Sequence, residues 1–204
     1  MTLVELAENY RKLGKGFAYT DKNTVHSYLP VYDMLLSPLK NTAKNILEIG
    51  VLEGGSIKLW HDYFKNATIF GFDIENKIKV PEILSKKRIK LNLNQNAYNK
   101  NFVKKNFNNI KFDFLIDDGP HILASMICFI RYYLPLLQND GVLIIEDIQD
   151  ISWTEQLISE VPDSLKKYIE IYDLRQFKNR ADDILFVINK RSTNDCPTIK
   201  TIKV

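Results

Sequence analysis

The chain has 204 residues, of which 45% are hydrophobic and 26% are charged, and its formal net charge at pH 7 is +3. No apolar run approaches the roughly 18 residues of a membrane span, and the N-terminus lacks a secretory pattern, so we expect a soluble, cytoplasmic protein that does not bind membranes. The small net charge argues against nucleic-acid binding, and the two cysteines, Cys128 and Cys196, are too few for a disulfide scaffold and are expected to be structural.

Two helices are predicted near the N-terminus, over residues 2–13 and 24–38, because apolar residues recur there near helical spacing. They are expected to form an N-terminal helical cap (1–40) before a core that spans residues 45–190. The last stretch, 191–204, is locally basic and is expected to be a frayed, solvated tail. No linker composition divides the chain, so we expect the whole length to form a single domain.

From residue 45 onward, short apolar runs alternate with amphipathic segments of helical length, which is the rhythm of βαβ units. Runs that are apolar almost throughout suit a parallel sheet covered by helices on both faces. The last two runs are joined by a polar segment that favours a loop or hairpin. The predicted fold is therefore α/β and Rossmann-like, with a seven-stranded, mostly parallel sheet and an antiparallel last strand. The strands are expected at 45–50, 68–73, 88–93, 112–117, 141–147, 168–174 and 183–190.

A glycine-rich turn follows the first predicted strand, where residues 48–56 read Glu-Ile-Gly-Val-Leu-Glu-Gly-Gly-Ser. Glycines permit a tight strand-to-helix turn and close approach of a ligand, and the next helix offers unpaired N–H groups to a carboxylate. The second strand ends in Asp73, whose carboxylate can accept hydrogen bonds from both hydroxyls of a ribose. These features favour an adenosine-containing cofactor. The alternative is a turn that only connects strand and helix, with Asp73 capping the strand end.

The spacing of this turn separates two kinds of cofactor. A dinucleotide fingerprint reads G-x-G-x-x-G, whereas here Leu52 stands in place of the second glycine and the acidic Glu48 precedes the turn. The pattern resembles motif I of the class I methyltransferases, which use S-adenosyl-L-methionine (SAM). By that resemblance Glu48, Gly50, Leu52 and Ser56 would line the methionine end of SAM, and Asp73 would bind its ribose. A nicotinamide-dependent dehydrogenase is the disfavoured alternative.

Polar amides follow the third predicted strand, at 92–96, where they are placed either to meet the adenine edge or simply to form a loop. In the methyltransferases that the chain resembles, this position often reads Asp-Gln. Asn94 departs from that pattern, so Gln95 alone is carried over as a cofactor contact.

Acidic residues gather after the fourth and fifth predicted strands. The two clusters read Asp117-Asp118-Gly119-Pro120-His121 and Glu146-Asp147. Because neighbouring parallel strands end at one edge of a sheet, we expect these carboxylates to converge beside the methyl donor. Carboxylates within about 4 to 6 Å raise one another's pKa unless a cation keeps them ionised, and oxygen ligands favour Mg²⁺, Mn²⁺ or Ca²⁺ over zinc. We predict Asp118, Glu146 and Asp147 as metal ligands, and Asp117 facing the cofactor or the sheet.

His121 lies three residues beyond Asp118, at the start of a predicted helix. Its imidazole titrates near neutrality and can take a proton from a hydroxyl whose acidity a metal has increased. We predict that His121 is the general base. A histidine at a helix start is more often a capping or packing residue, but the flanking carboxylates favour the catalytic role.

The order Asp-Gly-Pro-His and then Glu-Asp is similar to the metal-dependent O-methyltransferases of macrolide deoxysugars and rhamnosyl groups, which are grouped with cephalosporin hydroxylase-like sequences. Segments 21–28 and 174–183 also resemble that group, so the likeness covers about residues 20–190. In that group the motif reads Asp-Gly-Ser-His, its acid and the Glu-Asp pair hold Mg²⁺, and its histidine is the base. Pro120 replaces the serine here and leaves both functional positions in place. The resemblance implies methylation of a hydroxyl on a sugar or sugar-containing small molecule, without naming the acceptor.

Two other functions stay open. Catechol-type small-molecule O-methyltransferases also place acidic metal ligands after strands four and five, and the basic tail suggests an RNA-directed methyltransferase or a SAM-binding scaffold. We expect a small-molecule or glycan hydroxyl acceptor rather than nucleic acid as partner, and a homo-oligomer is left open. His26 is either a substrate or cofactor contact or a packed helix residue. Arg175 and Arg180 are either acceptor contacts or members of surface salt bridges.

Overall fold

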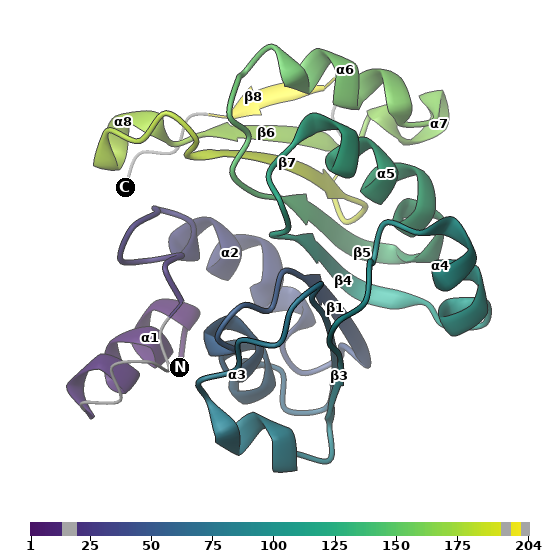
Figure 1. The fold of residues 1–204 in the computed structure, drawn as a ribbon. Helices are drawn as coiled ribbons and strands as arrows, with labels where there is room; N and C mark the ends of the chain where they lie inside the picture. The colour runs from purple at the N-terminus through teal and green to yellow at the C-terminus, as the bar shows by residue number, and fades with distance from the viewer. Residues whose placement is uncertain (14–19, 193–196, 201–204) are drawn as a thin grey trace. The chain divides into compact units, whose positions relative to one another are not determined.

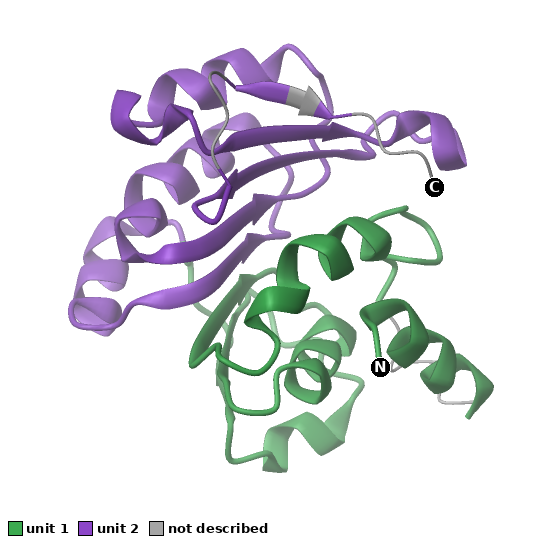
Figure 2. Cartoon of the chain, turned by 180° about the vertical axis from the view of Figure 1, so that it is seen from behind, with its two compact units in different colours: residues 1–97 green, residues 98–204 purple. Residues whose placement is uncertain are grey.

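The computed structural model describes residues 1–13, 20–192 and 197–200 of the chain, which divides into two compact units, 1–97 and 98–204 (Figures 1 and 2). That the whole length forms a single domain stays a prediction. None of the helices in the described ranges is both long and apolar enough to cross a membrane.

The first unit begins with α1 (Leu3–Lys12), whose start is a capping box in which Thr2 and Glu5 each bind the other's backbone N–H. The next helix, α2 (Leu29–Leu36), begins later than the predicted residue 24. Residues before it form a turn instead, because the carbonyl of Asp21 accepts three successive N–H groups, those of residues 24 to 26. The Asp33 carboxylate on α2 accepts the N–H of Leu3 at 2.6 Å, which joins the two helices.

The first unit also contains three parallel strands in the order β3-β2-β1. Ile49, at the end of β1, pairs with Phe72, at the end of β2, so Gly50 and Asp73 follow at the same edge. α3 packs against β2. The elements that follow α2 are η1 (Ser37–Leu39), β1 (Asn45–Ile49), α3 (Gly55–Tyr63), β2 (Thr68–Phe72), η2 (Pro81–Ser85) and β3 (Ile89–Asn92).

The second unit has its strands in the order β4-β5-β7-β6-β8, and its longer helices lie along one side of them (Figure 2). β4 is parallel to β5, whereas β7 is antiparallel to both β5 and β6, as predicted for the last strand of the core. The elements are α4 (Lys100–Phe107), β4 (Phe112–Asp117), α5 (Leu123–Tyr133), η3 (Leu134–Leu136), β5 (Leu137–Ile145), α6 (Trp153–Glu160), α7 (Asp163–Lys166), β6 (Ile169–Asp173), α8 (Arg175–Lys178), β7 (Ile184–Asn189) and β8 (Thr198–Lys200).

Two details of the second unit differ from the sequence prediction. The connection between β6 and β7 contains a one-turn helix, α8, rather than a loop alone. Part of the expected frayed tail forms β8, which pairs in parallel with β6. The buried carboxylate of Glu170 explains this ordering, because it accepts hydrogen bonds from Lys200 at 2.6 Å and from Ser192 at 2.7 Å. Cys196 lies outside the described residues.

Candidate functional site

The turn between β1 and α3 has the backbone that its glycines permit. Gly50 and Gly54 have φ angles of 91° and 92°, and Leu52 between them has a φ of 46° with an exposed side chain. Gly54 is the N-cap of α3 and has no side chain to bind the first N–H groups of the helix. The first N–H groups of α3, which no side chain at Gly54 caps, are therefore the backbone donors available to an anionic group. Binding of the methionine carboxylate there stays a prediction.

Asp73 braces this turn. Its Oδ2 accepts the N–H groups of Val51 at 2.9 Å and Leu52 at 2.8 Å, and its Oδ1 accepts the N–H of Glu75 at 2.9 Å. A carboxylate has about four acceptor positions, so one remains for a ribose hydroxyl. The N–H of Gln95 donates to the carbonyl of Asp73 at 3.0 Å, which places the predicted adenine-side residue beside the predicted ribose residue.

Glu48 and Ser56, two of the predicted cofactor residues, bind each other. The Glu48 side chain is fully buried, and its Oε2 accepts the Ser56 hydroxyl at 2.8 Å and the Trp60 indole N–H at 3.2 Å. Lys22, also fully buried, places its ammonium 3.9 Å from Oε1 of Glu48. Sequence reasoning missed Lys22, because a lysine in a polar stretch is ordinarily solvated. A direct contact of Glu48 or Ser56 with SAM stays a prediction.

The carboxyl ends of β4 and β5 bring together Asp118, His121 and Asp147. The Nε2 atom of His121 lies 3.1 Å from Oδ1 of Asp118 and 3.5 Å from Oδ2 of Asp147. Each of these three residues has a possible metal-ligating atom within 4.8 Å of those of the other two. In the described part of the chain, Glu146 is not a member of this group. Two carboxylates at this spacing fit a divalent cation, with the imidazole of His121 beside them.

Glu146 nevertheless follows the last residue of β5 directly, next to the end of β4. Its side chain is buried, and its N–H donates to the carbonyl of Asp117 at 3.0 Å. Its assignment as a third carboxylate ligand stays a prediction.

The electrostatics of the cluster favour a bound positive charge. Burial by itself would lower the pKa of His121, but its hydrogen bond with Asp118 and the negative charges of Asp118, Asp147 and Asp117 raise that pKa above its ordinary value. The cluster thus attracts a proton in the absence of a metal, and a cation would satisfy the same carboxylates.

Asp117 is buried behind this cluster. Burial raises the pKa of its carboxyl to about 7, the charge of Asp118 adds to this, and hydrogen bonds from Tyr98 and Gly119 oppose it. The Tyr98 hydroxyl donates to Oδ1 of Asp117, while Oδ2 has no hydrogen-bond partner among the described residues. Tyr98 was not among the predicted site residues, because a tyrosine in the polar stretch before α4 carries no pattern of its own.

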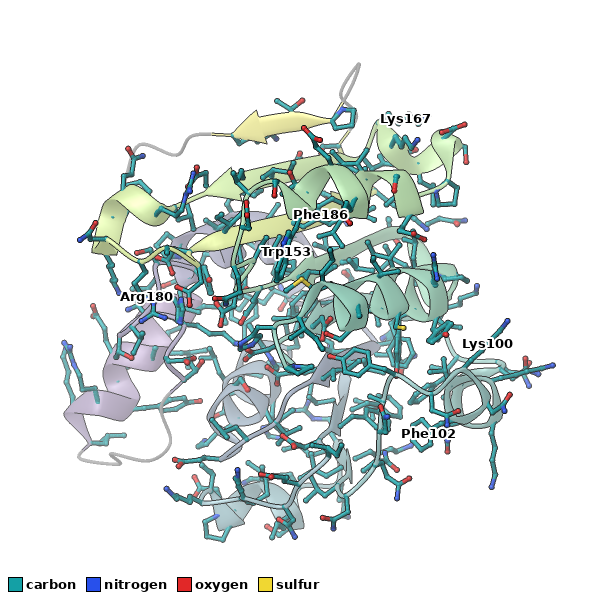
Figure 3. The ribbon with its side chains drawn as sticks, turned by 45° about the horizontal axis from the view of Figure 1, so that its top comes forward. Lys100, Phe102, Trp153, Lys167, Arg180 and Phe186 are labelled. Atoms are coloured by element: carbon teal, nitrogen blue, oxygen red, sulfur yellow. The ribbon has the colours of Figure 1, made fainter. Side chains whose placement is uncertain are left out.

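The remaining candidates are engaged locally. Arg175 forms a bidentate ion pair with Asp173, and Arg180, in the loop that leads into β7 (Figure 3), forms one with Asp182. The salt-bridge alternative thus accounts for both arginines as they stand. The His26 ring stacks on Tyr28, with centroids 4.8 Å apart, which favours its packing role.

Known proteins with sequences similar to this chain include sugar O-methyltransferases. No family model matches the chain. It is 27% identical over 146 residues to the 8-demethyl-8-alpha-L-rhamnosyl tetracenomycin-C 2'-O-methyltransferase of Streptomyces olivaceus, which covers 66% of the chain and 36% of that protein. It is 29% identical over 158 residues to the mycinamicin VI 2''-O-methyltransferase of Micromonospora griseorubida, which covers 74% of the chain and 37% of that protein. The chain resembles sugar O-methyltransferases. It spans little more than a third of the length of these curated relatives.

A solved structure supports the fold assignment. The MycE methyltransferase from the mycinamycin biosynthetic pathway, in complex with Mg and SAH, matches with a TM-score of 0.67 and 22% identity over 90% of this chain and 55% of that one. The chain therefore has the Rossmann-like fold of class I methyltransferases. The predicted fold class and the predicted resemblance are both confirmed.

Proposed function

We propose that this chain is a SAM-dependent, divalent-metal-assisted O-methyltransferase that acts on a hydroxyl of a sugar or sugar-containing small molecule. The observation that carries the proposal is the cluster of Asp118, His121 and Asp147 at the ends of β4 and β5. The similarity to rhamnosyl and macrolide-sugar O-methyltransferases supports the choice of acceptor class.

The residues present fit both cofactors. The glycine turn at 50–54 and the uncapped start of α3 suit the carboxylate of SAM, and Asp73 suits its ribose. Asp118 and Asp147, with Glu146 as the further predicted ligand, would hold Mg²⁺. When bound, SAM supplies an electrophilic methyl group and Mg²⁺ increases the acidity of a hydroxyl that it binds.

His121 would accept the hydroxyl proton on its imidazole, which the hydrogen bond between Nε2 and Asp118 orients. A cation bound by Asp118 and Asp147 would neutralise the negative charges that raise the pKa of His121. The imidazole would then be neutral and able to act as a base. The chain thus contributes orientation of the acceptor and a positioned base.

Methyl transfer from labelled SAM to a panel of rhamnosides, deoxysugar macrolides and catechols tests the proposal. We expect turnover of the sugar acceptors, its loss in EDTA and its return with Mg²⁺. Full turnover in chelator would contradict the metal mechanism, and a preference for catechols would replace the acceptor class.

His121→Ala should lower turnover by about 10²- to 10⁴-fold, the usual contribution of a general base, with little change in the affinity for S-adenosylhomocysteine. His61→Ala is the matched control, because His61 forms its hydrogen bond with Asp62 on α3.

A further inference from the structure

Tyr98 lies at the start of the second unit, just before α4, and its hydroxyl donates to Oδ1 of the buried Asp117. The bond therefore joins the segment before α4 to the carboxyl end of β4. Nothing in the chemistry described above uses this hydroxyl.

Asp117 connects the two strand ends that carry the candidate metal site. Its side chain receives the Tyr98 hydroxyl, and its carbonyl receives the N–H of Glu146 at 3.0 Å. Asp118 follows it directly, and Asp147 follows Glu146. Asp117 thus lies at the junction between the loop at 117–121 and the end of β5, with its side chain bonded to Tyr98.

Gly119 provides a second, independent observation. A Cβ atom built on Gly119 would overlap the Tyr98 hydroxyl and would lie 3.1 Å from Oδ1 of Asp117. The loop thus closes directly over the hydroxyl, which only a residue without a side chain permits.

We propose that Tyr98 is a positioning residue: through Asp117 it holds the loop at 117–121 so that Asp118 and His121 face Asp147. The consequence for metal binding rests on the proposed function, which assigns a cation to these residues. Residues that hydrogen-bond metal ligands typically contribute 10- to 100-fold in metal affinity, and Tyr98 acts one residue further out, through Asp117.

Tyr98→Phe removes only the hydroxyl, and Tyr172→Phe is its matched control. Tyr172 in the same unit donates its hydroxyl to the buried Glu170 at 2.7 Å. We expect Tyr98→Phe to weaken Mn²⁺ binding, measured by calorimetry, by about tenfold or more, and Tyr172→Phe to leave it unchanged. Unchanged affinity in Tyr98→Phe, with a loss of stability equal to that of Tyr172→Phe, would overturn the proposal and leave Tyr98 a structural role.

A double-mutant cycle tests the route through the hydroxyl. Gly119→Ala should weaken Mn²⁺ binding because the added methyl group displaces the Tyr98 hydroxyl, and it should cost less in the Tyr98→Phe background. An equal loss in both backgrounds would contradict a shared route.

The NMR signals of the His121 ring in metal-free protein separate this inference from the proposed function. Failure of the wild-type chain to bind Mn²⁺ would refute the metal site, whereas the His121 signals still decide the role of Tyr98. We expect Tyr98→Phe to shift the His121 signals and to leave those of His61 in place. Unmoved His121 signals would overturn the positioning role.

Discussion

Two residues of the candidate metal cluster have backbone conformations that are unfavourable for residues with a side chain. His121 has a φ of 53° and Asp147 a φ of 54°, both in the left-handed region. Such conformations persist where the surrounding structure holds them, and they concentrate at functional sites. Their occurrence in two facing members of one cluster supports a role that depends on the direction of these side chains.

The sequence predicted these cluster residues but not their supports. Asp118, His121 and Asp147 were predicted as site residues because acidic residues and a histidine follow two apolar runs. Tyr98 and Lys22 were missed, because their roles depend on Asp117 and Glu48, which lie far from them along the chain. Short-range patterns contain no signal for such tertiary partners.

Gly54→Ala tests the turn at the residue scale. Alanine would be strained at a φ of 92°, and its Cβ would lie 2.6 Å from Cδ1 of Ile83. We expect the free energy of unfolding, measured by urea denaturation, to fall by about 1 to 3 kcal/mol. Ile83→Val removes Cδ1, so Gly54→Ala should cost less in that background. Unchanged stability in Gly54→Ala would show that the turn does not require glycine there.

At the scale of elements, the position of α3 is fixed by contacts at both of its ends. Its first turn is joined to β1 through Ser56 and Glu48, and its last turn carries Asp62, which binds α1. Oδ2 of Asp62 accepts the Tyr10 hydroxyl at 2.5 Å and the Lys58 ammonium at 2.6 Å. The helix that begins at the glycine turn of residues 50–54 is thus held against the N-terminal helix.

Asp62→Asn should reveal this junction through its pH dependence. Burial alone would raise the pKa of Asp62, but hydrogen bonds from Lys58, Tyr10 and His61 lower it well below its usual range. A lowered native pKa gives stability that is present above the unfolded pKa, near 3.9, and is lost as the pH falls through the native pKa. We expect Asp62→Asn to cost about 1 kcal/mol at pH 7, because the group is partly exposed, and the difference to shrink below about pH 4.

Urea denaturation from pH 7 to pH 3 measures this difference. Asp140→Asn is the control, because the exposed Asp140 carboxylate lies 3.7 Å from Arg191 and should contribute little. A cost for Asp62→Asn that stays constant with pH would contradict the ionic role.

Helices and strands were predicted well where neighbouring residues alone determine them. The seven predicted strands correspond to β1 through β7, because continuous apolar runs mark strands that are buried. The start of α2 was placed too early, since the turn held by the Asp21 carbonyl interrupts an otherwise helical pattern. β8 was missed because a three-residue strand has no pattern of its own and depends on Glu170 for its ordering.

At the scale of the whole molecule, fold and function are supported by different observations. The match to MycE establishes the fold, and many chemistries share such a fold. The acceptor class is proposed from the site and from relatives of which the chain spans about a third. The central claim is that Asp118 and Asp147 bind a divalent cation in a chain whose glycine turn binds the SAM nucleoside.

Crystals grown with S-adenosylhomocysteine and Mn²⁺ test this claim most directly, because manganese can be located by its anomalous scattering. We predict an anomalous peak within about 2.5 Å of carboxylate oxygens of Asp118 and Asp147, with the nucleoside at the turn of residues 50–54 and its ribose on Asp73. A bound nucleoside with no manganese at these carboxylates, or manganese held only elsewhere, would contradict it.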